Sequence, residues 1–193
     1  MGFIGGCLFL LIVIAIFGAI WAIWRYNNLV SLKNQVANAW KQIDVQLKRR
    51  HDLIPNLIAS VKGEMQFEQD TLEKVIAARN TAVAARGVAD TAEKENQLTQ
   101  TLSRLFALAE NYPTLKANES VRALMEELSS TENKIGFARQ FYNDIATRFN
   151  TAQQIFPDSF IAQTFKFQPV ELYEIRDAAE REVPKVDLSV RPQ

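Results

Sequence analysis

The stretch KRRHDLIP, residues 48–55, gathers residue types that could perform chemistry. His51 is the only histidine in the chain, and it directly follows Lys48, Arg49 and Arg50. A histidine can act as a general base near neutral pH, and clustered cations can bind phosphate or carboxylate groups. A nucleophilic mechanism also needs a base aimed at a nucleophile, and no serine or cysteine lies close to His51 in the sequence. We therefore predict a structural or solvent-exposed His51.

Four charged residues fall on helix faces that are otherwise apolar. At about 100° per residue, Arg50 lies on the helix face that carries Leu47 and Ile54. Arg79 lies on the face that carries Val75 and Val83. Glu132 interrupts an apolar face one heptad before Arg139. Because unpaired charge inside a protein is costly, we predict that Glu132 accepts a salt bridge from Arg50, Arg79 or Arg139 and fixes the register of the helices. A ligand site for a carboxylate or phosphate is the functional alternative.

Motifs for other kinds of site are absent from the sequence. It contains no glycine-rich phosphate loop, dinucleotide fingerprint or HExxH motif. Cys7 is the only cysteine, which excludes an intramolecular disulfide and a multi-cysteine metal site, and one histidine cannot supply the two Glu-x-x-His pairs of a di-iron bundle. The formal net charge is zero, so the chain lacks the basic signature of a nucleic-acid-binding protein. We predict no catalytic, cofactor-binding or metal-binding residue, no small-molecule substrate, and no enzymatic activity.

The N-terminal segment, residues 2–24, contains no charged residue. About 20 apolar residues in a helix cross the hydrocarbon core of a bilayer, so this segment predicts contact with lipid as a transmembrane helix. A cleaved signal peptide would have a positive n-region and a shorter apolar core. A lipoprotein signal would place Cys7 after the hydrophobic stretch, and a buried core helix would rarely be apolar on every side.

Positive charge is concentrated just after this segment. Residues 25–62 hold seven Lys and Arg against two Asp, a net charge of +5, whereas residues 63–193 carry −5. The positive-inside rule then places the N-terminus outside and the body of the protein in the cytoplasm, with the opposite orientation as the alternative. These cations could bind anionic headgroups, but Lys48–Arg50 would lie about 35–40 Å beyond Trp24 along an upright helix.

The remaining pattern predicts an all-α protein. Apolar residues recur at steps of three and four over residues 26–50, 53–86, 91–112 and 119–156, which we predict to form an antiparallel four-helix bundle. Pro55 favours a helix that ends near Arg50 and a second one capped by Asp52, because proline inside a helix costs about 3 kcal/mol. A continuous helix through Pro55 is the alternative, since the apolar face keeps its phase from Leu47 to Val61.

The predicted organisation has three parts. Residues 1–25 form the transmembrane anchor, residues 26–158 the helical bundle, and residues 159–193 a short C-terminal tail docked on the bundle or on a neighbouring subunit. In this tail, residues 168–172 resemble a helix start and residues 184–188 an extended strand. Docking is predicted because the tail is apolar, with Phe160, Phe165 and Phe167 in its first part.

The segment YNNLVSLKNQVANAWKQIDVQLKRRHDLIPNLIASVKG resembles the signature of the LemA family of bacterial proteins. Three later segments resemble its further motifs in the same order: TLEKVIAAR, ENYPTLKANESVRALMEELSSTENKIGFARQFYN and FPDSFIA. The resemblance runs from about Tyr26 to Phe167. Where the family usually has an aromatic residue and a histidine after VKG, this chain has Glu64, Met65 and Phe67. The resemblance implies a membrane helix and a helical bundle in the bacterial inner membrane, and it assigns no reaction.

Together these observations predict a non-enzymatic, single-pass membrane-anchored scaffold or interaction protein that binds a protein partner or itself. The first alternative is an accessory subunit or adaptor of a membrane enzyme, such as a peptidase. A sensor of small anionic ligands, or an enzyme that uses the bundle arginines, ranks below both.

Overall fold

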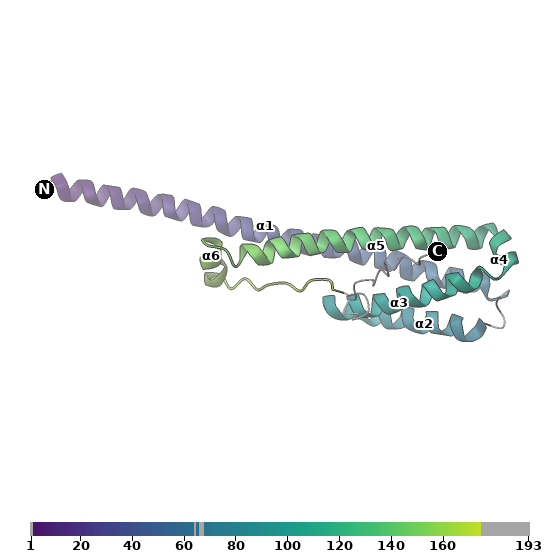
Figure 1. The fold of residues 1–193 in the computed structure, drawn as a ribbon. Helices are drawn as coiled ribbons and strands as arrows, with labels where there is room; N and C mark the ends of the chain where they lie inside the picture. The colour runs from purple at the N-terminus through teal and green to yellow at the C-terminus, as the bar shows by residue number, and fades with distance from the viewer. Residues whose placement is uncertain (1, 64, 66–67, 175–193) are drawn as a thin grey trace, which may run out of the picture.

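The structure, a computed structural model, describes residues 2–63, 65 and 68–174. Its dominant element is α1 (Gly2–Val61), a single helix of 60 residues. At about 1.5 Å per residue this helix is about 90 Å long. Its N-terminal part extends alone, and its C-terminal part lies within the bundle (Figure 1). In the described part of the chain, α1 is the one helix that is long and apolar enough to cross a membrane.

The continuity of α1 contradicts the predicted helix break between Arg50 and Asp52. Pro55 lies inside the helix, so Asp52 caps no helix start. Proline has no N–H, and the carbonyl that would accept its hydrogen bond belongs to His51, four residues earlier. Arg79 of α2 donates from Nε to that carbonyl at 3.0 Å. This side chain supplies the missing donor, which the sequence pattern alone did not reveal.

The remaining helices reverse direction at local stop signals. The predicted helix over residues 53–86 is wrong, because α1 ends at Val61 and α2 (Gln69–Ala84) is a separate helix.

α3 (Gly87–Ala109) begins at a glycine with φ of +78°, a conformation that residues with a Cβ rarely adopt. α4 (Pro113–Ala117) starts with proline, whose missing N–H costs nothing in a first turn. α5 (Glu119–Ala152) follows Asn118, whose side chain accepts from the backbone N–H groups of Ser120 and Val121.

The bundle consists of the C-terminal part of α1 with α2, α3 and α5, each antiparallel to the one before it (Figure 1). α1 packs most extensively on α5, and α2 on α3. Leu57, Leu98 and Leu128 lie in one buried cluster, and Ile43, Ile135 and Phe149 in a second one nearer the N-terminal part of α1. Each helix of the bundle buries one apolar face in this way. The described residues contain six helices and no strand, so the predicted all-α fold is confirmed.

The short helix α6 (Asp158–Thr164) packs against α1 where α1 leaves the bundle (Figure 1). Ile161 and Ala162 lie in a buried cluster with Leu29 of α1. Asp158 is buried and forms an ion pair with Arg25 at 3.4 Å. Beyond this point, towards the N-terminus, most of the large apolar side chains from Leu8 to Trp24 are exposed.

Residues 167–174 run back along the bundle without forming a helix, so the predicted helix start at residues 168–172 is wrong. Two asparagines of α5 hold this segment, and the side-chain amide of each bonds to both the backbone N–H and the backbone carbonyl of one residue. Asn150 accepts from Val170 N–H at 2.9 Å and donates to its carbonyl at 2.8 Å. Asn143 does the same with Tyr173, at 2.7 and 3.0 Å. The strand predicted at residues 184–188 lies outside the described residues.

Candidate functional site

Arg50 is the centre of a polar cluster inside the bundle. Its side chain is 1% exposed, and it forms ion pairs with Glu95 of α3 and Glu132 of α5. It also donates to Thr99 Oγ1 at 2.8 Å and to the carbonyl of Glu95 at 3.3 Å. We call Arg50, His51, Glu95, Thr99 and Glu132 the inner polar cluster. It joins three of the four bundle helices at one level.

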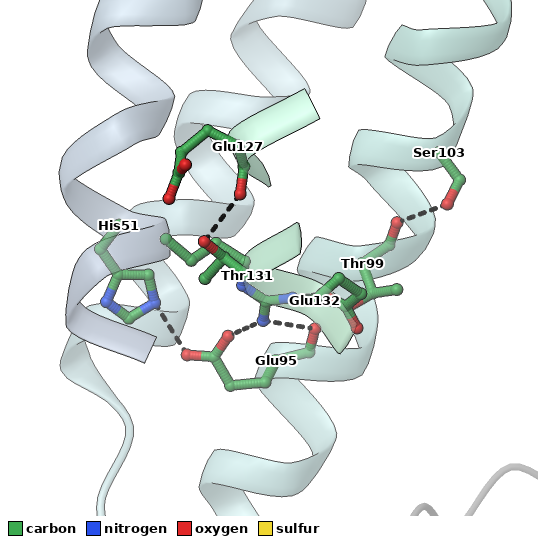
Figure 2. A network of polar contacts seen from close by, with 8 residues as sticks. His51, Glu95, Thr99, Ser103, Glu127, Thr131 and Glu132 are labelled. Atoms are coloured by element: carbon green, nitrogen blue, oxygen red, sulfur yellow. Dashed lines mark hydrogen bonds and ion pairs between the residues drawn. The ribbon is translucent and has the colours of Figure 1, made fainter. Parts of the chain in front are cut away.

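Glu95 is the most deeply buried carboxylate of this cluster, with a side chain 3% exposed. One of its oxygens faces Arg50, and the other accepts from His51 Nε2 at 2.8 Å (Figure 2). Burial alone would raise the pKa of Glu95. The hydrogen bond from His51 and the positive charge of Arg50 outweigh burial, so the pKa lies below its ordinary value of 4.5. Glu95 is therefore ionised at neutral pH despite its burial.

Glu132 lies at the edge of the cluster, with a side chain 36% exposed. Besides the ion pair with Arg50, it accepts from Thr99 Oγ1 at 3.2 Å. The predicted salt bridge from Glu132 thus forms with Arg50, the first of its three candidate partners. Arg79 donates to the His51 carbonyl instead, and the Arg139 guanidinium lies 4.8 Å from the centre of the Tyr173 ring.

Sequence reasoning missed Glu95 and Thr99. Glu95 precedes Leu102 and Ala109 by one and two heptads, so it lies on the face that these residues bury. That spacing is the signal that could have identified it, because a carboxylate on a buried face requires a partner. Thr99 is adjacent to buried Leu98 and gave no comparable signal.

The LemA family pattern matches residues 39–188, which include the whole inner polar cluster. The chain belongs to the LemA family. It is 29% identical to Protein LemA of Metamycoplasma hominis over 183 residues, covering 94% of this chain and 80% of that protein. It is 21% identical to Magnetosome protein MamQ of Magnetospirillum gryphiswaldense and to MamQ 2 of Paramagnetospirillum magneticum, in each case over 81% of this chain and 67% of the relative.

The inner polar cluster of this LemA-family chain borders a cavity of about 350 Å³. His51 and Glu95 line it from the cluster side. Its remaining polar lining carries both signs of charge, with Lys48 and Arg86 against Asp44. This mixture gives the cavity no clear preference for anions.

The chemistry open to the cluster is limited by how its groups are paired. Both terminal nitrogens of the Arg50 guanidinium already have acceptors, and each is bound to a carboxylate. To bind these two nitrogens, an incoming phosphate or carboxylate would have to displace Glu95 or Glu132, and the third nitrogen, Nε, is buried. Within the described residues, no group of three or more His, Cys, Asp or Glu side chains is placed to hold a metal ion.

Proposed function

We propose that this LemA-family chain is a non-enzymatic, single-pass membrane protein whose bundle serves as a scaffold for protein–protein interaction. The observation that carries the proposal is the unbroken α1, which is an exposed apolar rod at one end and a bundle helix at the other. A helix without a hinge fixes the bundle relative to the spanning segment, so the bilayer would hold the bundle at a defined height. Arg50, fixed between two carboxylates, supports a structural cluster and not a reactive one.

The membrane end of the chain supports an anchor in a bacterial inner membrane. Trp21 and Trp24 precede Arg25, whose guanidinium lies 5.7 and 4.9 Å from the centres of their rings. Aromatic rings beside a cation favour the headgroup region, so the span would end at this level. Arg25, Lys33 and Lys41 follow the apolar segment, which favours a cytoplasmic bundle with the N-terminus outside. A periplasmic bundle is the alternative.

A groove of about 530 Å³ between α1 and α5 is the proposed interaction surface. Val45, Phe137 and Phe141 are exposed along it by 62%, 73% and 45%. Lys41 and Lys134 also line this groove. Apolar side chains between two cations fit a protein segment that carries both apolar and acidic residues, so the proposed partner has that chemistry.

The test compares the full-length protein with the double variant Phe137→Ser/Phe141→Ser in detergent. A photo-crosslinker at Val45 should capture a partner with the unaltered groove and lose it with the double variant. Val83→Ser, which alters an exposed residue outside this groove, is the matched control and should retain the partner. A crosslinked second copy would identify self-association, and one constant enzyme partner would identify an accessory subunit. No crosslink to any protein would contradict the proposal.

The ligand-sensor alternative is tested separately with purified full-length protein. Inorganic phosphate and small dicarboxylates should leave the melting temperature unchanged if Arg50 is occupied by its own carboxylates. A rise that disappears in Arg50→Met would instead favour an anion site in the bundle.

A further inference from the structure

The turn into α6 and the residues after it carry large apolar side chains that remain mostly exposed in the described chain. Phe156 is 87% exposed, Phe160 68%, Phe165 57% and Ile155 54%. We call these four residues the aromatic corner. Such a concentration within eleven residues of sequence is costly in water, so it indicates a surface that is covered in the working protein.

The aromatic corner lies at the level where the apolar part of α1 ends. Ala22 and Tyr26 pack against the buried cluster that contains Ile161 of α6. The ring of Phe165 lies 4.6 Å from that of Tyr26, centre to centre. Ala22 belongs to the uncharged segment, so α6 overlaps the last turn of that segment along α1. In Figure 1, α6 lies beside α1 where the unaccompanied part of α1 begins.

The charges of this region suit a lipid surface. Residues 153–167 contain two charged side chains, Asp158 and Lys166. Asp158 is 4% exposed and paired with Arg25, so it presents little negative charge to a headgroup layer. Lys166 is exposed, and a cation at this level attracts anionic lipids. An apolar surface with one cation is the composition of an element that lies in a membrane interface.

We propose that the aromatic corner inserts into the headgroup region of the bilayer that α1 crosses. This inference rests on the proposed membrane anchor and extends it, because the bundle then contacts the membrane at two places. With a single spanning helix, α1 and the bundle can tilt together relative to the bilayer. A second contact, offset from the axis of α1, restricts this tilt and so favours the orientation in which the side of the bundle with α6 lies against the membrane.

The experiment measures the membrane depth of spin labels on the full-length chain in phosphatidylethanolamine–phosphatidylglycerol vesicles. Single cysteines are placed in a Cys7→Ser background at three positions. Gln163→Cys lies one turn after Phe160 and leaves the aromatic corner intact, Gln140→Cys replaces an exposed glutamine on α5, and Ile14→Cys lies in the apolar segment. Accessibility to oxygen relative to a water-soluble nickel chelate reports depth. We expect a ratio at position 163 several-fold above that at position 140.

Each other outcome has a distinct meaning. If position 14 lies in lipid but position 163 matches position 140, the corner is not inserted and the anchor stands. If position 14 is itself aqueous, the proposed anchor fails and this inference fails with it. If position 163 is shielded from both reagents, protein covers the corner, which overturns insertion in lipid. Adding Phe160→Asp to Gln163→Cys should lower the ratio towards that of position 140, whereas Phe137→Asp should leave it unchanged.

Discussion

The guanidinium of Arg79 donates a hydrogen bond to the backbone carbonyl of His51, the acceptor that Pro55 leaves without a helical partner. A proline inside a helix ordinarily kinks or ends it, partly because one carbonyl four residues earlier loses its donor. Here a side chain from the next helix takes the place of that donor. The contact joins α2 to α1 at the level of the inner polar cluster, so the proline supports a tertiary interaction while α1 continues.

This relationship predicts a coupling between residues 55 and 79. Arg79→Ala should lower the free energy of unfolding by about 1–2 kcal/mol, because the His51 carbonyl is left without a donor. The Pro55→Ala change restores a backbone N–H that can bond this carbonyl within the helix, so Arg79→Ala should cost markedly less in that background. The measurement is a double-mutant cycle of denaturant unfolding in detergent, followed by circular dichroism.

The matched control for this cycle is Arg104→Ala, which removes an arginine that is exposed on α3. It should change stability by less than about 0.5 kcal/mol in both backgrounds. Equal costs of Arg79→Ala in the wild-type chain and in the Pro55→Ala variant would show that Arg79 acts independently of the proline.

The inner polar cluster predicts an order of severity among three carboxylate replacements. Glu95→Ala should destabilise most, by about 3–5 kcal/mol, because it removes the more buried of the two carboxylates that neutralise Arg50. Glu132→Ala should cost less, since its side chain is partly exposed and Arg50 keeps Glu95. Glu127→Ala, which breaks the outer pair with Arg49, should cost about 0–1 kcal/mol. Thermal unfolding of the three variants tests the order, and a milder Glu95→Ala than Glu132→Ala would refute it.

The lowered pKa of Glu95 predicts loss of stability in acid. A carboxylate whose folded pKa lies below its ordinary value of 4.5 favours folding above pH 4.5, and this contribution disappears as pH falls through the folded pKa. The stability advantage of the wild-type chain over Glu95→Gln should therefore shrink below about pH 4.5. Urea unfolding over this range measures it. Glu93→Gln, at an exposed position on the same helix, should show no such convergence.

The sequence predicted the parts of this molecule that depend on local periodicity. The apolar segment and the helix faces gave the all-α fold, and the interruption of an apolar face at Glu132 led to its pairing with Arg50. Both are predictable from the sequence of one helix, because a buried face requires apolar residues at helical spacing and a buried charge requires a partner. The choice among Arg50, Arg79 and Arg139 was not predictable, since it depends on how the helices are offset along one another.

Two of the errors have a common physical cause. The break predicted at Asp52 assumed that Pro55 would lose its bond without compensation, but Arg79 supplies the donor from another helix. The helix predicted at residues 168–172 assumed that Pro169 opens a first turn. Backbone groups of this segment bond to the side chain of Asn150 instead. In each case a side chain distant in sequence forms hydrogen bonds with the backbone groups. The spacing of apolar residues along the sequence does not indicate such contacts.

The paired asparagines predict how the C-terminal segment is held. Asn143→Ala with Asn150→Ala removes four hydrogen bonds to Val170 and Tyr173, so this segment should leave α5 while the bundle stays folded. Hydrogen exchange at the amides of residues 170 and 173 should accelerate by about tenfold or more, since each tenfold corresponds to about 1.4 kcal/mol. Gln140→Ala, a change at an exposed position on α5, serves as the control and should leave exchange unchanged.

Tyr173 offers an independent readout of the same segment. Burial raises its pKa to about 12, with partial opposition from the positive charge of Arg139, against an ordinary value of 10.0. A raised pKa means that the docked segment favours the neutral phenol. Its contribution to docking is complete below pH 10 and is lost as pH rises towards 12. Ultraviolet titration should therefore show more tyrosine ionising near pH 10 in Asn143→Ala/Asn150→Ala than in the wild-type chain. Tyr173→Phe in both backgrounds assigns the signal, and identical titrations with and without the asparagines would mean that they do not hold Tyr173 in place.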